Sequence, residues 1–247
     1  FVLTGPGDPV ARRQAHLRGD RALQIPLPRI TRKAVLQVRA KLRRARSPIA
    51  ILQNPDEHLR VPAEKLSIIR NGIDLASLKQ RPSQEFADIP RILCIGRLCE
   101  QKGQDILLKA LAKISRPWKL DFLGEGPDRL SLERLAESLG IAPRVTFAGS
   151  VADVRTRLAK ADLVCIPSRW EGQSLALLEA VGSNVPVLVQ DLPIFHESFD
   201  DGMLSYVSSP KPEAWTKALE EVLQGPSDAL LRAYHAEDRV KQVFSRA

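Results

Sequence analysis

Short apolar runs alternate with stretches of helical periodicity over most of the chain. Continuous apolar runs predict buried strands over residues 91–96, 118–123, 144–148, 163–166 and 185–189. Apolar residues that recur every three or four positions predict helices over residues 105–114, 129–139, 151–160, 174–181, 212–223 and 229–246. Strands that alternate with helices are typical of a parallel sheet with helices on both faces, so the predicted fold class is α/β.

Several of these strands end at residues that permit sharp turns, namely Gly96, Gly124, Gly149 and Pro167. In parallel sheets, ligands bind in the crevice at the carboxyl ends of the strands. We therefore expect the ligand site at this edge of the sheet.

The pattern is weaker before residue 91. Two short strands are predicted over 49–52 and 66–69, and the proline-containing stretch 71–90 is predicted to be a hinge or linker. The expected organisation is a partial N-terminal domain (1–70), this linker (71–90), a sheet domain (91–225) and a C-terminal helical segment (226–247).

Residues 29–46 carry eight Lys or Arg side chains and no acid, on a helical apolar stripe. This pattern suits either a helix lying on an anionic membrane surface or an ordinary solvated helix face. Nucleic-acid binding is not favoured, because aromatic residues make up only 5% of the chain and none interrupts the basic run.

The composition is that of a soluble globular protein, with 247 residues, 44% hydrophobic and 27% charged, and a net charge of +8. No apolar run approaches the ~20 residues needed to span a bilayer. The first residues lack the pattern of a signal peptide and an initiator Met, so we expect a fragment or a processed chain. The three cysteines form no pair motif, which favours free thiols in a reducing, cytoplasmic compartment. No Asp-x-Asp pair or His/Cys cluster predicts a metal ion.

Two glutamates, Glu171 and Glu179, lie eight positions apart around a predicted helix start at Gly172 and Ser174. A helix start offers unpaired N–H groups and a positive dipole end to an anion, and the carboxylates could hold the hydroxyl groups of a sugar nucleotide. The alternative is a loop acid and a solvated helix glutamate.

The loop after the first predicted strand of the sheet domain, 96–103, contains a second group of candidates. Arg97 and Lys102 suit a diphosphate through charge-assisted hydrogen bonds. The alternative is a pair of surface cations. The chain has neither a G-x-G-x-x-G fingerprint nor a Walker loop, which disfavours dinucleotide and P-loop sites.

Taken together, linked motifs in this order resemble the family-four retaining glycosyltransferases, enzymes of the GT-B fold, over about residues 48–225. The matching motifs are Asn71–Asp74, Gly96–Gly103, Leu123–Pro127, Val145–Gly149, Glu171–Glu179 and Pro186–Val187. The resemblance implies that residues 91–225 form the Rossmann-like C-terminal half of a GT-B fold, preceded by a partial N-terminal domain. It also implies that residues 226–247 cross back to that domain.

The resemblance implies a role for each matching position. Arg97 and Lys102 would hold the donor diphosphate, and Glu171 the donor sugar; these three are the predicted catalytic residues. Glu179 would accept from the ribose hydroxyls. The remaining predicted donor-binding positions supply backbone N–H groups, line the base or shape the cleft: Gly96, Gly124, Val145, Phe147, Gly172, Gln173, Ser174 and Leu175.

The implied reaction is transfer of a hexosyl group, with retention of configuration and without a metal ion or other cofactor, from a nucleoside-diphosphate sugar. We expect a UDP-sugar first and a GDP-sugar second, with a glycan or lipid-linked acceptor at the inner face of the membrane. The alternative function is a non-catalytic nucleotide-sugar-binding or scaffold subunit that needs a catalytic partner.

Three features depart from the family pattern. Gln173-Ser174 replaces the usual Phe-Gly, but Ser can still cap the helix. Asn184 replaces a glycine, and Asn tolerates left-handed backbone. Only about 70 residues precede Asn71-Gly72, too few for a complete acceptor domain, so we expect either a fragment or completion by a partner.

Overall fold

The computed structural model describes residues 2–3, 49–51, 66–68, 72–82 and 85–244. The chain divides into two compact units, residues 1–71 and 72–247. In the first unit, β1 (Val2–Leu3) pairs antiparallel with β2 (Ile49–Ile51), which pairs parallel with β3 (Leu66–Ile68). The strands predicted over 49–52 and 66–69 are thus confirmed. The predicted basic helix of residues 29–46 lies outside the described residues.

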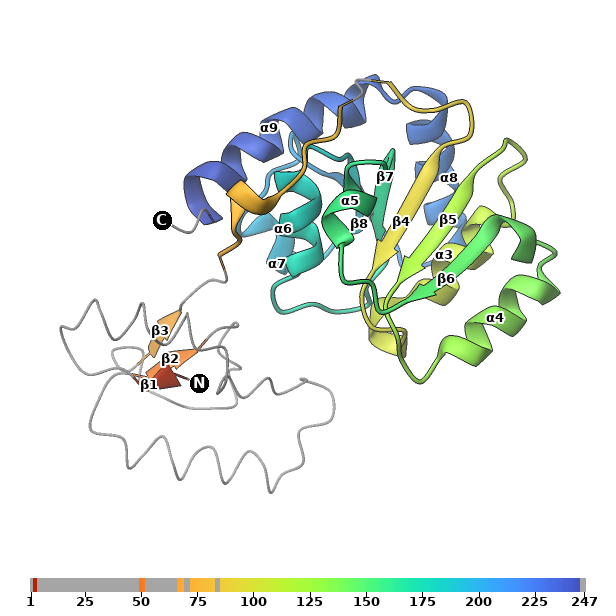
Figure 1. The fold of residues 1–247 in the computed structure, drawn as a ribbon, viewed down its shortest axis with the longest axis horizontal. Helices are drawn as coiled ribbons and strands as arrows, with labels where there is room; N and C mark the ends of the chain where they lie inside the picture. The colour runs from red at the N-terminus through yellow and green to blue at the C-terminus, as the bar shows by residue number, and fades with distance from the viewer. Residues whose placement is uncertain (1, 4–48, 52–65, 69–71, 83–84, 245–247) are drawn as a thin grey trace. The chain divides into compact units, whose positions relative to one another are not determined.

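The second unit is built on a six-stranded parallel sheet in the order β6-β5-β4-β7-β8-β9. Its strands are β4 (Arg91–Ile95), β5 (Lys119–Leu123), β6 (Val145–Gly149), β7 (Leu163–Ile166), β8 (Val187–Gln190) and β9 (Ser205–Val207). The chain builds outward from β4 to one edge and then returns to build from β7 to the other (Figure 1). The boundary between β4 and β7 is therefore the switch point of a Rossmann-like sheet, and such folds bind ligands at the strand ends there.

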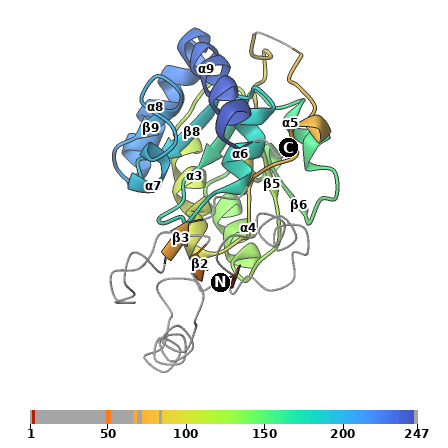
Figure 2. The same cartoon turned by 90° about the vertical axis from the view of Figure 1, so that its left-hand side faces the viewer.

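Helices cover both faces of this sheet (Figures 1 and 2). One core layer contains α3 (Gln104–Leu111), α4 (Arg129–Ser138) and α8 (Pro212–Gln224). The other layer contains α5 (Val154–Leu158), α6 (Leu175–Gly182), α7 (Pro193–His196) and α9 (Ser227–Phe244). Short 3-10 turns lie at Leu75–Ser77, Glu100–Lys102 and Ala142–Arg144. The predicted α/β class, with a parallel sheet and helices on both faces, is confirmed.

The strands β4 to β8 were all predicted, because their apolar residues are buried on both faces of the sheet. Among the strands and α-helices of the second unit, β9 and α7 were missed. Both are short, and β9 has a single fully buried residue, Val207, so neither leaves a periodic pattern in the sequence.

The segment predicted to be a linker packs along the second unit in its described residues, 72–82 and 85–90. Arg81 is buried, and its Nη2 lies 3.1 Å from Oδ1 of Asp162. Asp162 also accepts the backbone N–H of Ala87 at 3.2 Å and of Arg91 at 2.8 Å. At the far end of the segment, the N–H of Ile73 donates to the carbonyl of Phe244 in α9 at 2.9 Å. Hydrogen bonds thus fasten both the start and the end of this segment to the second unit.

The turn after α6 confirms the expectation for Asn184. Its φ is +55°, a left-handed conformation that an asparagine adopts at lower cost than most residues. The N–H of Val185 then returns to the carbonyl of Ala180 at 3.1 Å, which closes the helix end before β8.

Candidate functional site

Two loops leave the sheet at the switch point and lie against each other. The first follows β4 and ends at Gly103, and the second follows β7 and begins at Pro167. Gly103 has φ +65°, and a Cβ placed on it would lie 2.1 Å from the carbonyl oxygen of Pro167. Only a glycine allows this approach, so Gly103 sets the distance between the loops.

The close approach joins two predicted catalytic residues into one ion pair. Nζ of Lys102 lies 2.6 Å from Oε1 of Glu171, and the hydroxyl of Ser168 donates to the same oxygen at 2.7 Å. The Glu171 side chain is only 5% exposed and that of Lys102 is 21% exposed. These charge-assisted hydrogen bonds hold a carboxylate and an ammonium group in fixed positions at the switch point.

Further hydrogen bonds between the same loops surround this pair. The N–H of Arg169 donates to the carbonyl of Gln101 at 2.8 Å, and the Gln101 amide donates to the carbonyl of Trp170 at 3.0 Å. The Arg169 guanidinium donates to the carbonyl of Glu100 at 2.6 Å and to both carboxylate oxygens of Asp105 at 2.9 and 3.0 Å. Since the bonds run in both directions, the two loops form one rigid layer.

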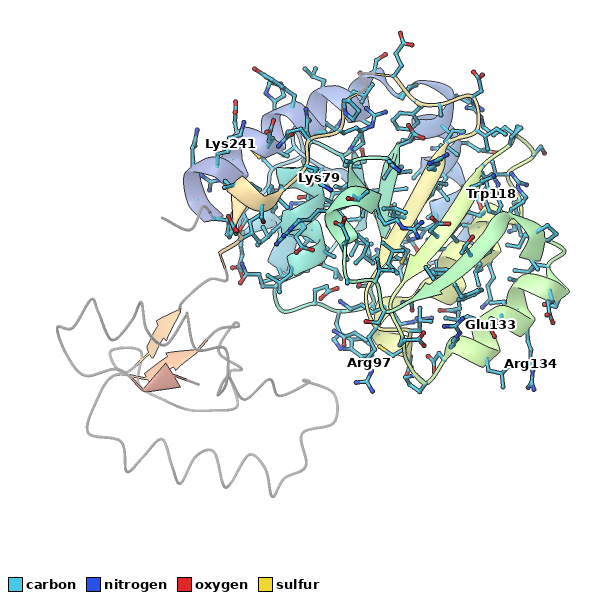
Figure 3. All side chains as sticks on the ribbon, viewed as in Figure 1. Lys79, Arg97, Trp118, Glu133, Arg134 and Lys241 are labelled. Carbon is cyan, nitrogen blue, oxygen red and sulfur yellow. The ribbon has the colours of Figure 1, made fainter. Side chains whose placement is uncertain are left out.

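Arg97, predicted to act with Lys102, is placed differently from it. The Arg97 side chain is exposed and makes no hydrogen bond or ion pair within the described residues. Figure 3 shows it extending outward from the ribbon. Its backbone is nevertheless anchored, because the amide of Gln104 donates to its carbonyl at 2.9 Å. The loop thus presents an unengaged guanidinium close in sequence to an engaged ammonium group.

The predicted helix start behind Glu171 is confirmed at α6. Ser174 is the N-cap, and its hydroxyl accepts the N–H of Leu177 at 3.3 Å. The N–H groups of the first turn, Leu175 included, have no acceptor within the helix. Gly172 and Gln173 are half-buried in the loop that leads to this turn. The site therefore combines the fixed ammonium group of Lys102 with a positive helix end.

Glu179 lies one turn further along α6 and is half-buried. Burial raises the pKa of the Glu179 carboxyl, and the positive charge of Arg155 lowers it in part. The carboxylate has no hydrogen-bond partner within the described residues. Its acceptor capacity is therefore available to a ligand with hydroxyl groups.

Gly96 and Gly124 lie where β4 and β5 end, and Val145 and Phe147 belong to the edge strand β6. Gly124 has φ +147°, and a Cβ on it would lie 2.1 Å from the carbonyl oxygen of Gly96, so the ends of β4 and β5 can touch only because Gly124 lacks a side chain. Phe147 stacks on Phe122 with ring centroids 5.1 Å apart, and both Phe147 and Val145 pack against the core. The roles predicted for Val145 and Phe147 along a base stay predictions.

Sequence reasoning missed the side chains that organise the site: Ser168, Arg169, Gln101 and Asp105. Ser168 and Arg169 lie within three residues of Glu171, and this closeness in sequence could have marked them as candidates. Arg169 binds Glu100 and Asp105, which lie more than 60 residues earlier, and no local sequence pattern reveals such a contact. In the described part of the chain, no group of three His, Cys, Asp or Glu side chains could hold a metal ion.

These features define the class of α/β domains that bind ligands at the switch point of a parallel sheet. Residues 89–225, more than half of the chain, match the family described as Glycosyl transferases group 1. The chain belongs to this family.

Curated relatives carry related names. The O-antigen chain mannosyltransferase RfbU of Salmonella typhimurium is 29% identical, over 74% of this chain and 52% of its own length. A GDP-mannose-dependent alpha-(1-6)-phosphatidylinositol monomannoside mannosyltransferase of Mycobacterium tuberculosis is 32% identical, over 51% of this chain and 38% of its own. An uncharacterized glycosyltransferase of Methanocaldococcus jannaschii is 33% identical over 75% of this chain. The chain spans about half the length of the first of these relatives.

Solved structures show the same fold. HepE from Anabaena, crystallised with UDP and glucose, superposes with a TM-score of 0.78 at 20% identity, covering 87% of this chain and 64% of HepE. The isolated C-terminal domain of the group 1 glycosyltransferase LpcC from Francisella tularensis superposes with a TM-score of 0.63 at 20% identity, covering 71% of this chain and all of that domain. Structural neighbours of this kind are GT-B glycosyltransferases, which confirms the predicted fold.

Proposed function

We propose that this chain is the donor-binding part of a retaining, metal-independent hexosyltransferase that uses a nucleoside-diphosphate sugar. The observation that carries the proposal is the Lys102–Glu171 pair at the switch point between β4 and β7, within a group 1 glycosyltransferase domain. One side chain of this pair suits a diphosphate and the other suits sugar hydroxyls.

The chemical task is to stabilise negative charge on the departing diphosphate while positive charge builds on the sugar. Lys102 and Arg97 supply cations, and the first turn of α6 supplies N–H groups and a dipole. The ammonium group of Lys102 and the first turn of α6 are held in place before any ligand arrives, whereas the Arg97 side chain is exposed and unengaged within the described residues. Fixed charges of this kind lower the barrier without reorganisation at the moment of reaction.

In this proposal Glu171 and Glu179 accept hydrogen bonds from different hydroxyl groups of the donor. Oε1 of Glu171 is engaged by Lys102 and Ser168, while Oε2 has no partner within the described residues and can accept from a donor sugar hydroxyl. The carboxylate of Glu179, which accepts no hydrogen bond from the described residues, can accept from the ribose. Within this proposal no step requires a metal ion.

For the donor we propose a UDP-sugar first and a GDP-sugar second. HepE was crystallised with UDP, and the mycobacterial relative is named as GDP-mannose-dependent. Thermal unfolding of the chain with UDP, GDP and ADP, each with and without EDTA, tests this choice. A ligand at ~100 times its Kd adds about 2.7 kcal/mol, a shift of a few degrees.

We expect one base to give the shift, EDTA to leave it unchanged and Lys102→Ala to abolish it. Lys113→Ala is the matched control, because Lys113 forms an exposed ion pair with Glu213 far from the site. No shift with any nucleotide would refute the donor site. A shift without donor hydrolysis or transfer would favour a non-catalytic binding subunit, and a β-linked product from an α-linked donor would refute retention.

For the acceptor we propose a glycan or glycolipid at the inner face of the membrane. The relatives named above act on O-antigen chains and on a phosphatidylinositol mannoside, and residues 29–46 carry a basic run. In the described part of the chain, none of the helices is long and apolar enough to cross a bilayer. Equal co-sedimentation with neutral and anionic vesicles at low salt would refute the membrane contact.

A further inference from the structure

The loops that carry Lys102 and Glu171 are joined through a second ion pair, between Arg169 and Asp105. We infer that Arg169 and Asp105 form a positioning pair that sets the place of Lys102 against Glu171. This inference rests on the proposed function, and it assigns a role to two side chains that touch neither the diphosphate nor the sugar in that proposal.

The guanidinium of Arg169 contacts the chain on both sides of Lys102. Nη2 of Arg169 donates to Oδ1 and Oδ2 of Asp105, in the first turn of α3, at 2.9 and 3.0 Å. Nη1 donates to the carbonyl of Glu100, the first residue of the 3-10 turn that ends at Lys102, at 2.6 Å. In the sequence, Lys102 therefore lies between Glu100 and Asp105, the two residues that the Arg169 guanidinium binds.

The backbone of the same arginine also binds the first loop. Its N–H donates to the carbonyl of Gln101 at 2.8 Å, and Glu171 lies two residues after Arg169. Because the side chain holds Glu100 and Asp105 while the backbone holds Gln101, we expect a change in the Arg169 side chain to shift Lys102 relative to Glu171. Reacting groups displaced by about 1 Å can lose a hundredfold in rate, so such positioning has functional weight.

The chemistry of the pair requires arginine. Only its planar fork reaches a carboxylate and a carbonyl at once, whereas lysine offers a single point of charge. Both partners are partly exposed, 29% for Arg169 and 31% for Asp105, and neither belongs to the core. We therefore expect substitution to loosen the loops without unfolding the sheet.

Chemical modification of Lys102 tests the inference without any nucleotide. In the full chain, limited acetylation read by mass spectrometry reports how firmly the Lys102 ammonium group is held. We expect Arg169→Gln and Asp105→Asn to raise the acetylation rate of Lys102 about tenfold, the size of one lost charge-assisted hydrogen bond. Arg169→Lys should fall between these variants and the wild type.

Lys109→Gln is the matched control. Nζ of Lys109 lies 3.3 Å from Oδ2 of Asp105, so this variant removes a partner of the same carboxylate without touching Arg169. We expect it to leave the acetylation rate of Lys102 unchanged. An unchanged rate in Arg169→Gln, or an equal rise in Lys109→Gln, would overturn the inference.

A double-mutant cycle on UDP affinity separates positioning from direct contact. Arg169→Gln should weaken UDP binding about tenfold in the wild type, and by less than about twofold in a Lys102→Ala background. Equal losses in both backgrounds would show that Arg169 acts independently of Lys102 and would overturn the inference. Failure of the wild type to bind UDP, GDP or ADP would refute the proposed function, while the acetylation rates would still decide the positioning role.

Discussion

At the scale of the residue, Glu179 shows how burial prepares a side chain for a ligand. Its carboxylate is half-buried and unpartnered within the described residues, and burial raises its pKa. At neutral pH the buried charge therefore lowers the free energy of unfolding. This loss of stability begins to shrink as the pH falls to the raised pKa, and it is gone once the pH is below the ordinary pKa of a glutamate. A ribose that donates hydrogen bonds to the charged carboxylate would lower that pKa again.

This balance predicts opposite effects of Glu179→Gln on stability and on affinity. At neutral pH the variant should unfold at a slightly higher temperature when empty, yet bind UDP about tenfold more weakly, because it loses hydrogen bonds to a charged acceptor. The wild type should lose its advantage in UDP affinity over the variant as the pH falls. Because the pKa of Glu179 is raised, this loss should begin at a higher pH than it would for an ordinary glutamate.

Calorimetric titration of the wild type and of Glu179→Gln with UDP, over the same pH range, measures this difference in affinity. The comparison cancels the protonation of the UDP phosphate itself, which affects both proteins equally. A wild-type advantage that is constant over the range would contradict the role of the Glu179 charge.

Single residues also show where sequence reasoning stops. Lys102, Glu171 and Ser174 could each be identified as site residues from local pattern and family resemblance. That Lys102 is paired with Glu171, while Arg97 stays exposed, depends on a contact between positions 69 residues apart. The ion pair between Arg169 and Asp105 also joins distant positions, and in the sequence each of these residues looks like an ordinary surface charge.

At the scale of the element, the crevice depends on how closely two loops approach at Gly103. A Cβ there would lie 2.1 Å from the carbonyl oxygen of Pro167, in a left-handed conformation. Gly103→Ala should therefore lose about 1–2 kcal/mol for the backbone and a further 1–3 kcal/mol for the clash. Urea unfolding measures the sum.

Gly140→Ala provides the control for this prediction. Gly140 has φ +71°, but a Cβ on it would meet no atom within 4 Å. It should therefore lose only the backbone cost, about 1–2 kcal/mol. Equal losses in the two variants would show that the loops do not need to touch.

The segment of residues 72–90 depends on one buried ion pair. Asp162→Ala would remove the carboxylate that pairs with the buried guanidinium of Arg81, leaving that charge only its backbone carbonyl acceptors, and would remove the acceptor of two backbone N–H groups. The expected loss in the free energy of unfolding is about 3–5 kcal/mol. Glu213→Ala, which breaks an exposed pair with Lys113, should cause no measurable change by the same urea titration.

Elements were predictable where burial repeats along the chain. The buried strands β4 to β8 and the amphipathic helices α3 and α8 have strong apolar patterns. The edge strand β9 has three residues and lies beside only one neighbour, so its structure comes from pairing with β8 rather than from its own sequence.

At the scale of the whole molecule, the site and the described core belong to the second unit. Every described member of both core clusters lies at or after Ile73, and so does every proposed site residue. The LpcC domain from Francisella tularensis, solved by itself, superposes over its whole length on this chain. We therefore expect a chain of residues 72–247 to fold alone and to keep the thermal shift with UDP.

Calorimetry of the full and shortened chains makes this comparison. Loss of the UDP shift in a shortened chain that still unfolds cooperatively would show that residues 1–71 contribute to the donor site. Loss of the cooperative transition itself would show that the second unit is not an independent folding unit.

The Lys102–Glu171 pair has a consequence for turnover. A diphosphate that takes Lys102 leaves a carboxylate with 5% exposure short of a donor, unless the ligand brings hydroxyl groups to replace the lysine. Under the proposed function, the sugar of an intact donor would supply such hydroxyl groups, whereas the nucleotide left after transfer would not. The ion pair between Lys102 and Glu171 would then re-form in competition with the bound nucleotide, which would favour release of this product before the next donor binds.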